Sequence, residues 1–246
     1  MRDMTNGFLS GKGAVVTGGS RGIGRAIVLA LAREGASVVF CGRDQQGVQK
    51  AVADLRQQAG SQQIYGIAAD VRDPSQVEAL FRFADEQLGR IDVLVNNAGV
   101  GIFRPTGDLS IEDWRAVIET NLTGAFLCSR EAIARFRRQG GGSIIHISSL
   151  AGKHGMAGGA AYNASKFGLN GMAEAMMLDH RYDNIRVSTI LPGSVATEFG
   201  GQRTGEQAWK IAPEDIAEIV LTILRMPERT LISAVEVRPA KPHRPS

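Results

Sequence analysis

The stretch that decides the fold is Ala14-Val15-Val16-Thr17-Gly18-Gly19-Ser20-Arg21-Gly22-Ile23-Gly24, in which a short apolar run leads into a glycine-rich turn. Apolar residues then recur at helical spacing up to Leu31, and Gly35 follows as a glycine after a helix would. A strand, a glycine-rich turn and a helix form the first half of a dinucleotide-binding unit. The bare backbone can approach a pyrophosphate, and the helix N-terminus attracts its charge.

The rest of the chain repeats this alternation of strand and helix. Further strands are predicted at 37–41, 62–69, 91–95, 143–148, 185–191 and 232–237, and helices at 45–59, 73–88, 110–138, 160–182 and 213–225. Such alternation predicts an α/β fold, a doubly wound Rossmann domain with a mostly parallel sheet of about seven strands. We expect residues 1–246 to form this single domain, with flexible tails at 1–10 and 239–246.

Composition excludes several classes of function. The net charge is only +3 and the chain has no dense Lys/Arg run, so we expect no nucleic-acid partner. No run of eighteen apolar residues exists and the N-terminus lacks an apolar signal core, so we expect no membrane span. Cys41 and Cys128 lie in apolar stretches, which predicts buried free thiols and a reducing cytoplasm. We expect no metal site.

The end of the second predicted strand bears on the choice of cofactor. An NAD-binding unit carries an acidic residue there, which holds the ribose 2′-hydroxyl. This strand instead runs into Gly42-Arg43-Asp44, and Arg21 lies in the glycine-rich turn. Two guanidiniums suit a 2′-phosphate, so we favour NADP(H). NAD(H) is the alternative, with Asp44 on the ribose, although Asp44 is also well placed to cap the following helix.

Tyr162 and Lys166 are the first candidates for chemistry, because a spacing of four puts them on one face of a helix. An ammonium about 5 Å from a phenol favours the phenolate by roughly two pKa units, which brings a tyrosine toward acid/base work near neutral pH. Ser149, at the end of the strand 143–148, can hold the same substrate oxygen. The competing interpretation is a solvated helix face, where Tyr and Lys commonly occur together.

The polar ends of the strands are expected to share one rim, because ligands of open α/β sheets bind beyond the carboxyl ends. With these residues in place, the chain resembles the short-chain dehydrogenase/reductase family from about Gly11 to Thr197. The resemblance is carried by four motifs in the family's order: Thr17-Gly18-x-x-x-Gly22-Ile23-Gly24, Asn96-Asn97-Ala98-Gly99, Tyr162-x-x-x-Lys166 and Pro192-Gly193. It implies an oxidoreductase that uses NADP(H) to interconvert a carbonyl compound, a ketone, an aldehyde or a 3-oxoacyl compound, and its alcohol, as a carbonyl reductase does. The alternative is an NAD-dependent alcohol or polyol dehydrogenase with Asp44 on the ribose.

The resemblance also implies residue roles. The catalytic tetrad would be Asn121, Ser149, Tyr162 and Lys166, with Tyr162 as acid/base and Asn121 holding a water in a proton relay from Lys166. Ser148 is the rival for the serine role, but the spacing to Tyr162 favours Ser149. The expected cofactor contacts are Gly18, Ser20, Arg21, Gly22, Ile23, Gly24, Arg43, Asp70, Val71, Asn97, Ala98, Gly99, Tyr162, Lys166, Pro192, Gly193, Val195 and Thr197.

Within that set the resemblance assigns finer contacts. Asp70 and Val71 would touch the adenine, and Asn97 would support the central strand. Lys166 would bind the nicotinamide ribose, and Thr197 the carboxamide or a phosphate.

Two departures leave the substrate open. Reductases of 3-oxoacyl carrier-protein thioesters have an Asp-Gly-Gly run near the last strand, where this chain has Ala234-Val235-Glu236-Val237-Arg238-Pro239. The stretch 198–212, which contains Phe199, Arg203, Trp209 and Lys210, is short for a substrate-covering lid. Trp209 either closes on the substrate or packs the lid. His154 either lines the pocket or is solvated.

The assembly is another expectation from the resemblance. Family members are commonly homotetramers or homodimers built through the helices that here carry Asn121 and Tyr162. Ala125, Phe126 and residues 172–177 are then either core or interface. A non-catalytic dinucleotide sensor would need the glycine turn alone, and the presence of Ser149, Tyr162 and Lys166 argues against it.

Overall fold

The computed structural model describes residues 7–197, 199 and 208–242. The expected tails at 1–6 and 243–246, and Arg203 with most of the predicted lid, lie outside the described residues.

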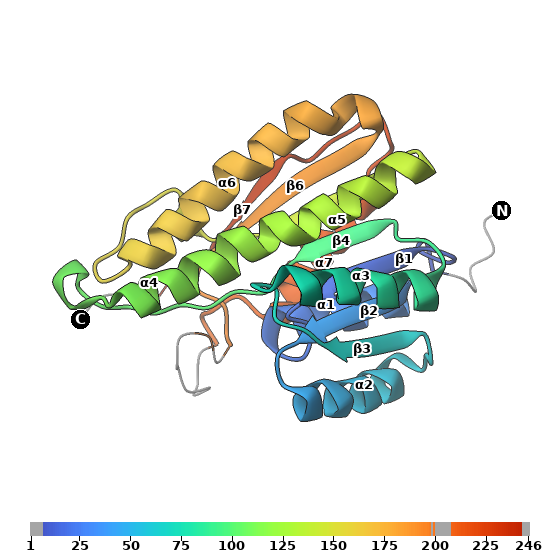
Figure 1. Cartoon of the computed structure of the whole chain (residues 1–246), viewed down its shortest axis with the longest axis horizontal. Helices are drawn as coiled ribbons and strands as arrows, with labels where there is room; N and C mark the ends of the chain where they lie inside the picture. Colours follow the sequence, from blue (N-terminus) through green and yellow to red (C-terminus); the bar gives the residue numbers. More distant parts are fainter. Residues whose placement is uncertain (1–6, 198, 200–207, 243–246) are drawn as a thin grey trace.

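Within these residues, seven strands form one sheet in the order β3-β2-β1-β4-β5-β6-β7, and every neighbouring pair is parallel. The strands are β1 (Gly13–Thr17), β2 (Ser37–Gly42), β3 (Ile64–Ala68), β4 (Val93–Asn96), β5 (Gly142–Ile147), β6 (Ile185–Pro192) and β7 (Ala234–Val237). The helices are α1 (Gly22–Arg33), α2 (Gln45–Ala59), α3 (Pro74–Leu88), α4 (Ile111–Ile118), α5 (Gly124–Gln139), α6 (Ala160–His180) and α7 (Pro213–Arg225). The predicted doubly wound α/β fold is confirmed (Figure 1).

The central strands β1, β4, β5 and β6 bury both of their faces, which explains why they read as continuous apolar runs rather than alternating ones. On β1, Val16 packs into the cluster that includes α1, α2 and α7, while Val15 packs into the opposite cluster with α3, α5 and α6. The layers follow from this alternation, because successive side chains of a strand point to opposite faces.

The long helix predicted at 110–138 differs from the structure in one respect. It is divided into α4 and α5 by a π-helical turn, η2 (Glu119–Thr123), where Gly124 N–H donates to Glu119 O. Asn121 lies in this turn. π turns are rare and are found mostly at functional sites.

The expected N-terminal tail is partly wrong. Leu9 is only 6% exposed and packs into the α1–α7 core, and its N–H donates to Glu34 O at 2.9 Å. Residues 7–10 therefore belong to the folded domain. Burial of Leu9 holds this segment against the domain, although its local sequence predicts neither a helix nor a strand.

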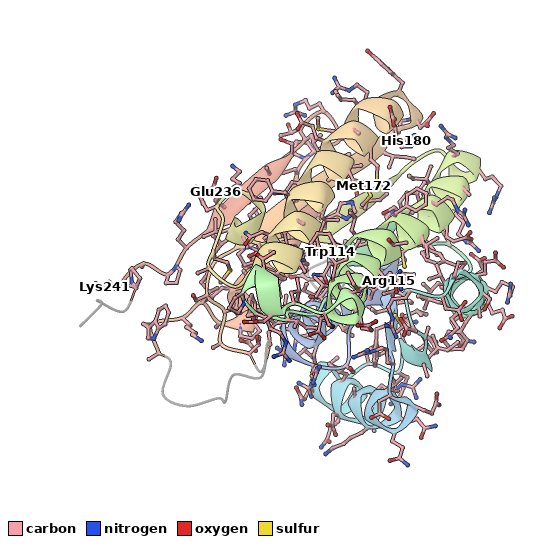
Figure 2. The ribbon with its side chains drawn as sticks, turned by 60° about the vertical axis from the view of Figure 1, so that its left-hand side comes forward. Trp114, Arg115, Met172, His180, Glu236 and Lys241 are labelled. Atoms are coloured by element: carbon pink, nitrogen blue, oxygen red, sulfur yellow. The ribbon has the colours of Figure 1, made fainter. Side chains whose placement is uncertain are left out.

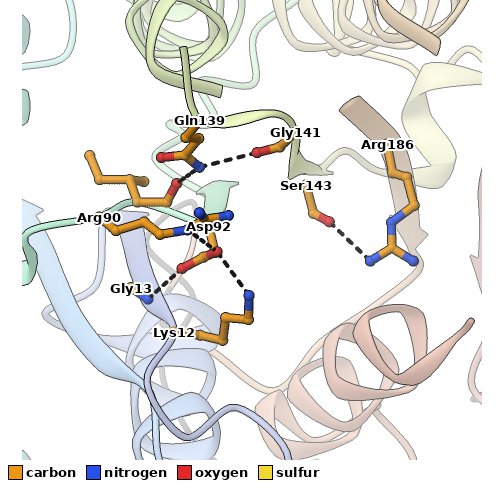
Figure 3. A network of polar contacts seen from close by, with 9 residues as sticks. Lys12, Gly13, Arg90, Asp92, Gln139, Gly141, Ser143 and Arg186 are labelled. Carbon is orange, nitrogen blue, oxygen red and sulfur yellow. Dashed lines mark hydrogen bonds and ion pairs between the residues drawn. The ribbon is translucent and has the colours of Figure 1, made fainter. Parts of the chain in front are cut away.

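Asp92 joins β1 to β4 at the end of the sheet opposite the predicted rim (Figure 3). Its carboxylate accepts hydrogen bonds from Gly13 N–H at 3.0 Å, Arg90 Nε at 2.8 Å and Lys12 Nζ at 3.1 Å. Burial alone would raise the pKa of Asp92, but these three donors outweigh it and hold the pKa below its ordinary value. The Asp92 carboxylate is therefore a stabilising anchor far from the site.

We expect Asp92→Ala to lower the free energy of unfolding by about 2 kcal/mol, because Gly13 N–H loses its acceptor in a buried position. A depressed folded pKa means that this stabilisation is present above the unfolded pKa and is lost as pH falls through the folded pKa, below about pH 4. Urea unfolding at pH 7 and pH 3 measures both effects, with exposed Glu86→Ala as control. Equal losses at the two pH values would contradict the anchor.

Cys41 and Cys128 are both buried and free, as predicted. Burial raises the pKa of the Cys41 thiol to about 11, so it stays protonated at neutral pH. No helix within the described ranges is long and apolar enough to cross a membrane.

Candidate active site

The site begins where the order of the strands reverses, since β1 lies between β2 and β4 (Figure 1). Ligands of doubly wound sheets bind in the crevice that this reversal opens. The glycine-rich turn follows β1 there, and Asn97 follows β4. Thr17 Oγ1 accepts from the N–H groups of Asn97 and Ala98 at 3.0 Å each, and Asn97 Nδ2 donates to the carbonyls of Thr17 and Gly18. Asn97 thus fixes the glycine turn as well as the strand end.

The glycine turn fits a pyrophosphate. Gly18 and Gly22 have φ of +67° and +55°, a region that favours glycine. A methyl group on Gly24 would lie 2.2 Å from Gly18 O, so α1 packs directly onto the turn. Arg21, which precedes α1, makes no side-chain cap to the helix, so the first amides remain available to an anion. Thr197, in the loop after β6, lies against Gly22.

The end of β2 carries Gly42, Arg43 and Asp44, the residues on which the choice between NADP(H) and NAD(H) depends. A Cβ on Gly42 would lie 3.0 Å from Ser20 Oγ and 3.1 Å from the Val48 side chain, so a larger residue at this position would have to displace its neighbours slightly. Asp44 caps α2 as predicted, accepting from Gly47 N–H at 2.8 Å and from Gln46 N–H at 3.3 Å. Arg43 is exposed, and its charge contributes to lowering the pKa of Asp70 on the neighbouring strand end.

The two predicted adenine contacts behave differently. Asp70 forms an ion pair with Arg72 at 2.5 Å, and this hydrogen bonding is the main reason that its pKa is lowered. The side chain of Val71 is 5% exposed and packs against Gly124 at the start of α5. Val71 therefore offers a ligand its main chain rather than its side chain.

Tyr162, Ser149 and Lys166 meet at the first turns of α6. Lys166 Nζ is 5.8 Å from the centre of the Tyr162 ring and donates to Ile147 O at 2.9 Å. Both side chains are buried, at 9% and 4% exposure, so the solvated helix face is wrong. The Lys166 ammonium has three N–H donors. Among the described residues, the acceptor found for it is Ile147 O.

Ser149, and not Ser148, is the serine next to the phenol. Ser148 is 5% exposed and its hydroxyl donates to Asn170 Oδ1 at 2.6 Å. Ser149 begins the turn η3 (Leu150–Gly152), where its Oγ accepts from Ala151 N–H at 3.1 Å, and it is hydrogen-bonded with Tyr162.

The expected effect of Lys166 on the phenol needs correction. Burial raises the pKa of Tyr162 above its ordinary value, and the hydrogen bond with Ser149 opposes that rise without reversing it. Burial also lowers the pKa of Lys166, to about 8. At the dielectric of a partly solvated protein surface, the charge of Lys166 alone would favour the phenolate. Packing puts both groups in a poorly solvated setting, where each charged form is disfavoured.

Asn121 connects helix α6 to the loop after β4. Its Oδ1 accepts from Val100 N–H at 2.8 Å, and its Nδ2 donates to Val100 O and to Ser165 Oγ at 3.0 Å each. Ser165 Oγ in turn donates to the main-chain carbonyl of Tyr162 at 2.8 Å. The side chain thus positions α6 against the loop after β4. The side-chain amide of Asn121 is engaged in these contacts, and its water-holding role stays a prediction.

The loop after β6 holds the remaining predicted contacts. β6 ends at Pro192, Gly193 N–H donates to Val237 O at 2.7 Å, and Val195 pairs with Ile211 in an isolated bridge. His154 is exposed, which favours the solvated alternative, and Trp209 is half-buried with Lys210 Nζ 5.6 Å from its ring centre.

Sequence reasoning missed several residues. Ser165 and Val100 hold Asn121, and Phe103 packs on Tyr162. His146, fully buried on β5, has a pKa lowered to about 3 by burial and by the charge of Lys166, so it stays neutral. The sequence signal for His146 was a polar residue inside the apolar run Ile144-Ile145-His146-Ile147. No sequence signal pointed to Phe103.

The comparisons with known proteins agree with this fold. The family model described as short chain dehydrogenase matches residues 12–208. The sepiapterin reductase of Chlorobaculum tepidum is 35% identical over 92% of this chain and 95% of its own length. The glycine betaine reductase ATRR of Emericella nidulans is 33% identical over 95% of this chain, but the chain spans only 19% of that protein.

Two solved structures are similar over nearly their whole length. The alcohol dehydrogenase from the archaeon Thermococcus sibiricus complexed with 5-hydroxy-NADP has a TM-score of 0.88 at 30% identity, covering 96% of this chain and 99% of that one. A metagenomic short-chain oxidoreductase in complex with NADP has a TM-score of 0.83 at 37% identity, with coverage of 95% and 99%.

Proposed function

The chain belongs to the short chain dehydrogenase family of oxidoreductases, and from that premise we propose that it uses NADP(H) to interconvert a ketone or aldehyde and its alcohol. The observation that carries the proposal is the meeting of Tyr162, Ser149 and Lys166 at the edge of the sheet where the glycine turn also lies.

In this proposal the bound nicotinamide supplies or accepts the hydride at the carbonyl carbon. Tyr162 donates a proton to the carbonyl oxygen during reduction and removes it during oxidation. Ser149 holds that oxygen in place by a hydrogen bond. Lys166 uses its remaining donors on the ribose hydroxyls, and its charge favours the phenolate that proton donation leaves.

The raised pKa of Tyr162 suits reduction. A phenol with a raised pKa stays protonated through neutral pH, so the proton donor is present, and it is lost only on the alkaline side. Oxidation of the alcohol needs the phenolate and is therefore favoured as pH rises.

Arg43 is the residue on which we base the preference for NADP(H). We expect Arg43→Ala to raise the KM for NADPH about tenfold, because one charge-assisted contact to the 2′-phosphate is lost, and to change the KM for NADH less than twofold. Steady-state kinetics with both cofactors measures this, with Arg82→Ala on the exposed face of α3 as control. A lower KM for NADH than for NADPH in the unmodified protein would support the NAD alternative, with Asp44 on the ribose.

The test of the reaction class is the loss of NADPH absorbance in the presence of ketones, aldehydes, diketones and an acetoacetyl thioester. Consumption with any of these carbonyls supports the proposal, and the thioester arm decides whether 3-oxoacyl compounds are substrates. Tight NADPH binding without consumption would favour a dinucleotide sensor.

We also propose that the protein is a homodimer or homotetramer through α5 and α6. A shallow groove of about 480 Å³ lies between these helices, with Met172 and His180 along its α6 side (Figure 2). Phe126 lines it from α5 and is 44% exposed, and Leu178 on α6 is 54% exposed. Exposed apolar side chains along one helix pair are typical of a protein interface.

Light scattering after size exclusion tests the assembly. We expect a mass of two or four times 26.3 kDa for the unmodified protein, and a smaller assembly for Phe126→Asp, because a charge would be buried without a partner. A monomeric unmodified protein at micromolar concentration would contradict the proposal.

A further inference from the structure

The surroundings of the Tyr162 ring carry information about the substrate. Phe103, in the loop after β4, lies edge-to-face on Tyr162 with ring centres 5.5 Å apart, and Phe199, after β6, lies 5.7 Å from it. Both phenylalanines meet above Gly101, where a methyl group would lie 2.6 Å from Phe199 and 2.9 Å from Phe103. Two loops far apart in sequence therefore bring an aromatic cluster, Phe103, Tyr162 and Phe199, to the proposed acid/base.

The cluster is not closed. Phe103 is 41% exposed and Phe199 is 39% exposed, whereas Tyr162 between them is 9% exposed. The two outer rings thus shield the phenol and still present apolar surface to a ligand. Exposed aromatic rings beside a reacting group contribute most binding free energy when the ligand is apolar and flat, because it can pack on the ring faces.

Two charged side chains of the loops around this cluster, both within the part of the chain that the structure describes, are already paired. Arg104, next to Phe103, forms an ion pair with Asp113 at 3.1 Å, and Lys153 forms one with Glu236 at 2.5 Å. Arg104 N–H also donates to Gly158 O at 2.8 Å, which brings the Phe103 loop against the loop that holds Met156, 50% exposed. A charged substrate would have to compete with these two ion pairs, whereas an apolar substrate packs on the exposed rings of Phe103 and Phe199.

We propose that the substrate is a ketone carried on an apolar ring, aromatic or alicyclic, and that Phe103 and Phe199 select it by packing on the ring beside Tyr162. This rests on the proposed carbonyl reduction. To that proposed function the inference adds the class of substrate and two residues, Phe103 and Phe199, that determine specificity.

The test compares kcat/KM for acetophenone and cyclohexanone with kcat/KM for hydroxyacetone, a small polar ketone, all with NADPH. In the unmodified protein we expect the ring ketones to be preferred by about a hundredfold. Phe103→Ala and Phe199→Ala should each lower kcat/KM for the ring ketones about tenfold, mainly through KM, and change that for hydroxyacetone less than twofold.

Two further variants separate selection from folding. Phe103→Tyr keeps a ring and should keep the preference. Gly101→Ala must displace both phenylalanine rings and should lower the preference without removing either. Tyr182, an aromatic residue that is 92% exposed just after the end of α6, provides the matched control. Tyr182→Ala should change kcat/KM neither for the ring ketones nor for hydroxyacetone.

The outcomes distinguish the two proposals. Reduction of hydroxyacetone in preference to the ring ketones, or equal losses for all three substrates in the alanine variants, would overturn the ring-ketone inference and leave carbonyl reduction standing. No reduction of any carbonyl in the wider panel, with NADPH bound, would overturn both.

Discussion

Tyr162→Phe is expected to lower kcat for carbonyl reduction by about a thousandfold, while the Kd for NADPH changes less than threefold. The substitution removes one hydroxyl and keeps the ring. Packing against Phe103 and Phe199 is therefore retained, because the phenylalanine ring fills the same buried position. What is lost is the proton donor and the partner of Ser149.

The matched control is Tyr65→Phe, which makes the same chemical change on β3, away from Tyr162. It should leave kcat unchanged. Retained turnover in Tyr162→Phe would remove Tyr162 from the acid/base role, and an equal loss in Tyr65→Phe would point to a general effect of removing a phenol.

The second large effect is expected for Lys166→Met. We expect kcat/KM for reduction to fall at least a hundredfold and NADPH to bind more weakly, because the ribose loses a donor and the phenolate loses its neighbouring cation. Steady-state kinetics and fluorescence titration of NADPH measure the two effects separately. Lys50→Met, exposed on α2, is the control.

The same substitution should make the protein more stable. The folded pKa of Lys166 is about 8, against an unfolded value of 10.5, so below pH 8 the protein bears the cost of a buried ammonium. The cost is about 3 kcal/mol where Lys166 is protonated in the folded protein, and it falls as pH rises from 8 toward 10.5. Methionine removes the charge but leaves Ile147 O without its donor, so we expect a gain of about 1–2 kcal/mol at pH 7.

Urea unfolding at pH 7 tests this gain. A less stable Lys166→Met protein would mean that the Ile147 hydrogen bond outweighs the desolvation of the ammonium. Stability and activity moving in opposite directions is the mark of a residue retained for function.

The features that sequence analysis predicted are those that local chemistry decides. The glycine turn after β1, the cap of α2 by Asp44 and the start of α3 near Pro74 depend on neighbouring residues, and the structure confirms them. The choice of Ser149 over Ser148 was also accessible, since it needs only the spacing to Tyr162.

The features that it missed depend on tertiary contacts. The π turn at Asn121 is fixed by hydrogen bonds to Val100 and Ser165, which are distant in sequence or on another helix. The raised pKa of Tyr162 follows from its burial. No local pattern shows such an environment, so the estimate from the Lys166 charge alone had the wrong sign.

The most direct test of the central claim is the fate of deuterium from NADPH labelled at both C4 positions. Incubation with a carbonyl from the panel, followed by mass spectrometry and NMR of the alcohol, shows where the label goes. The proposal predicts one deuterium on the carbinol carbon of the product, and almost no product with Tyr162→Phe. A product without deuterium at that carbon would contradict hydride transfer from the cofactor to the carbonyl.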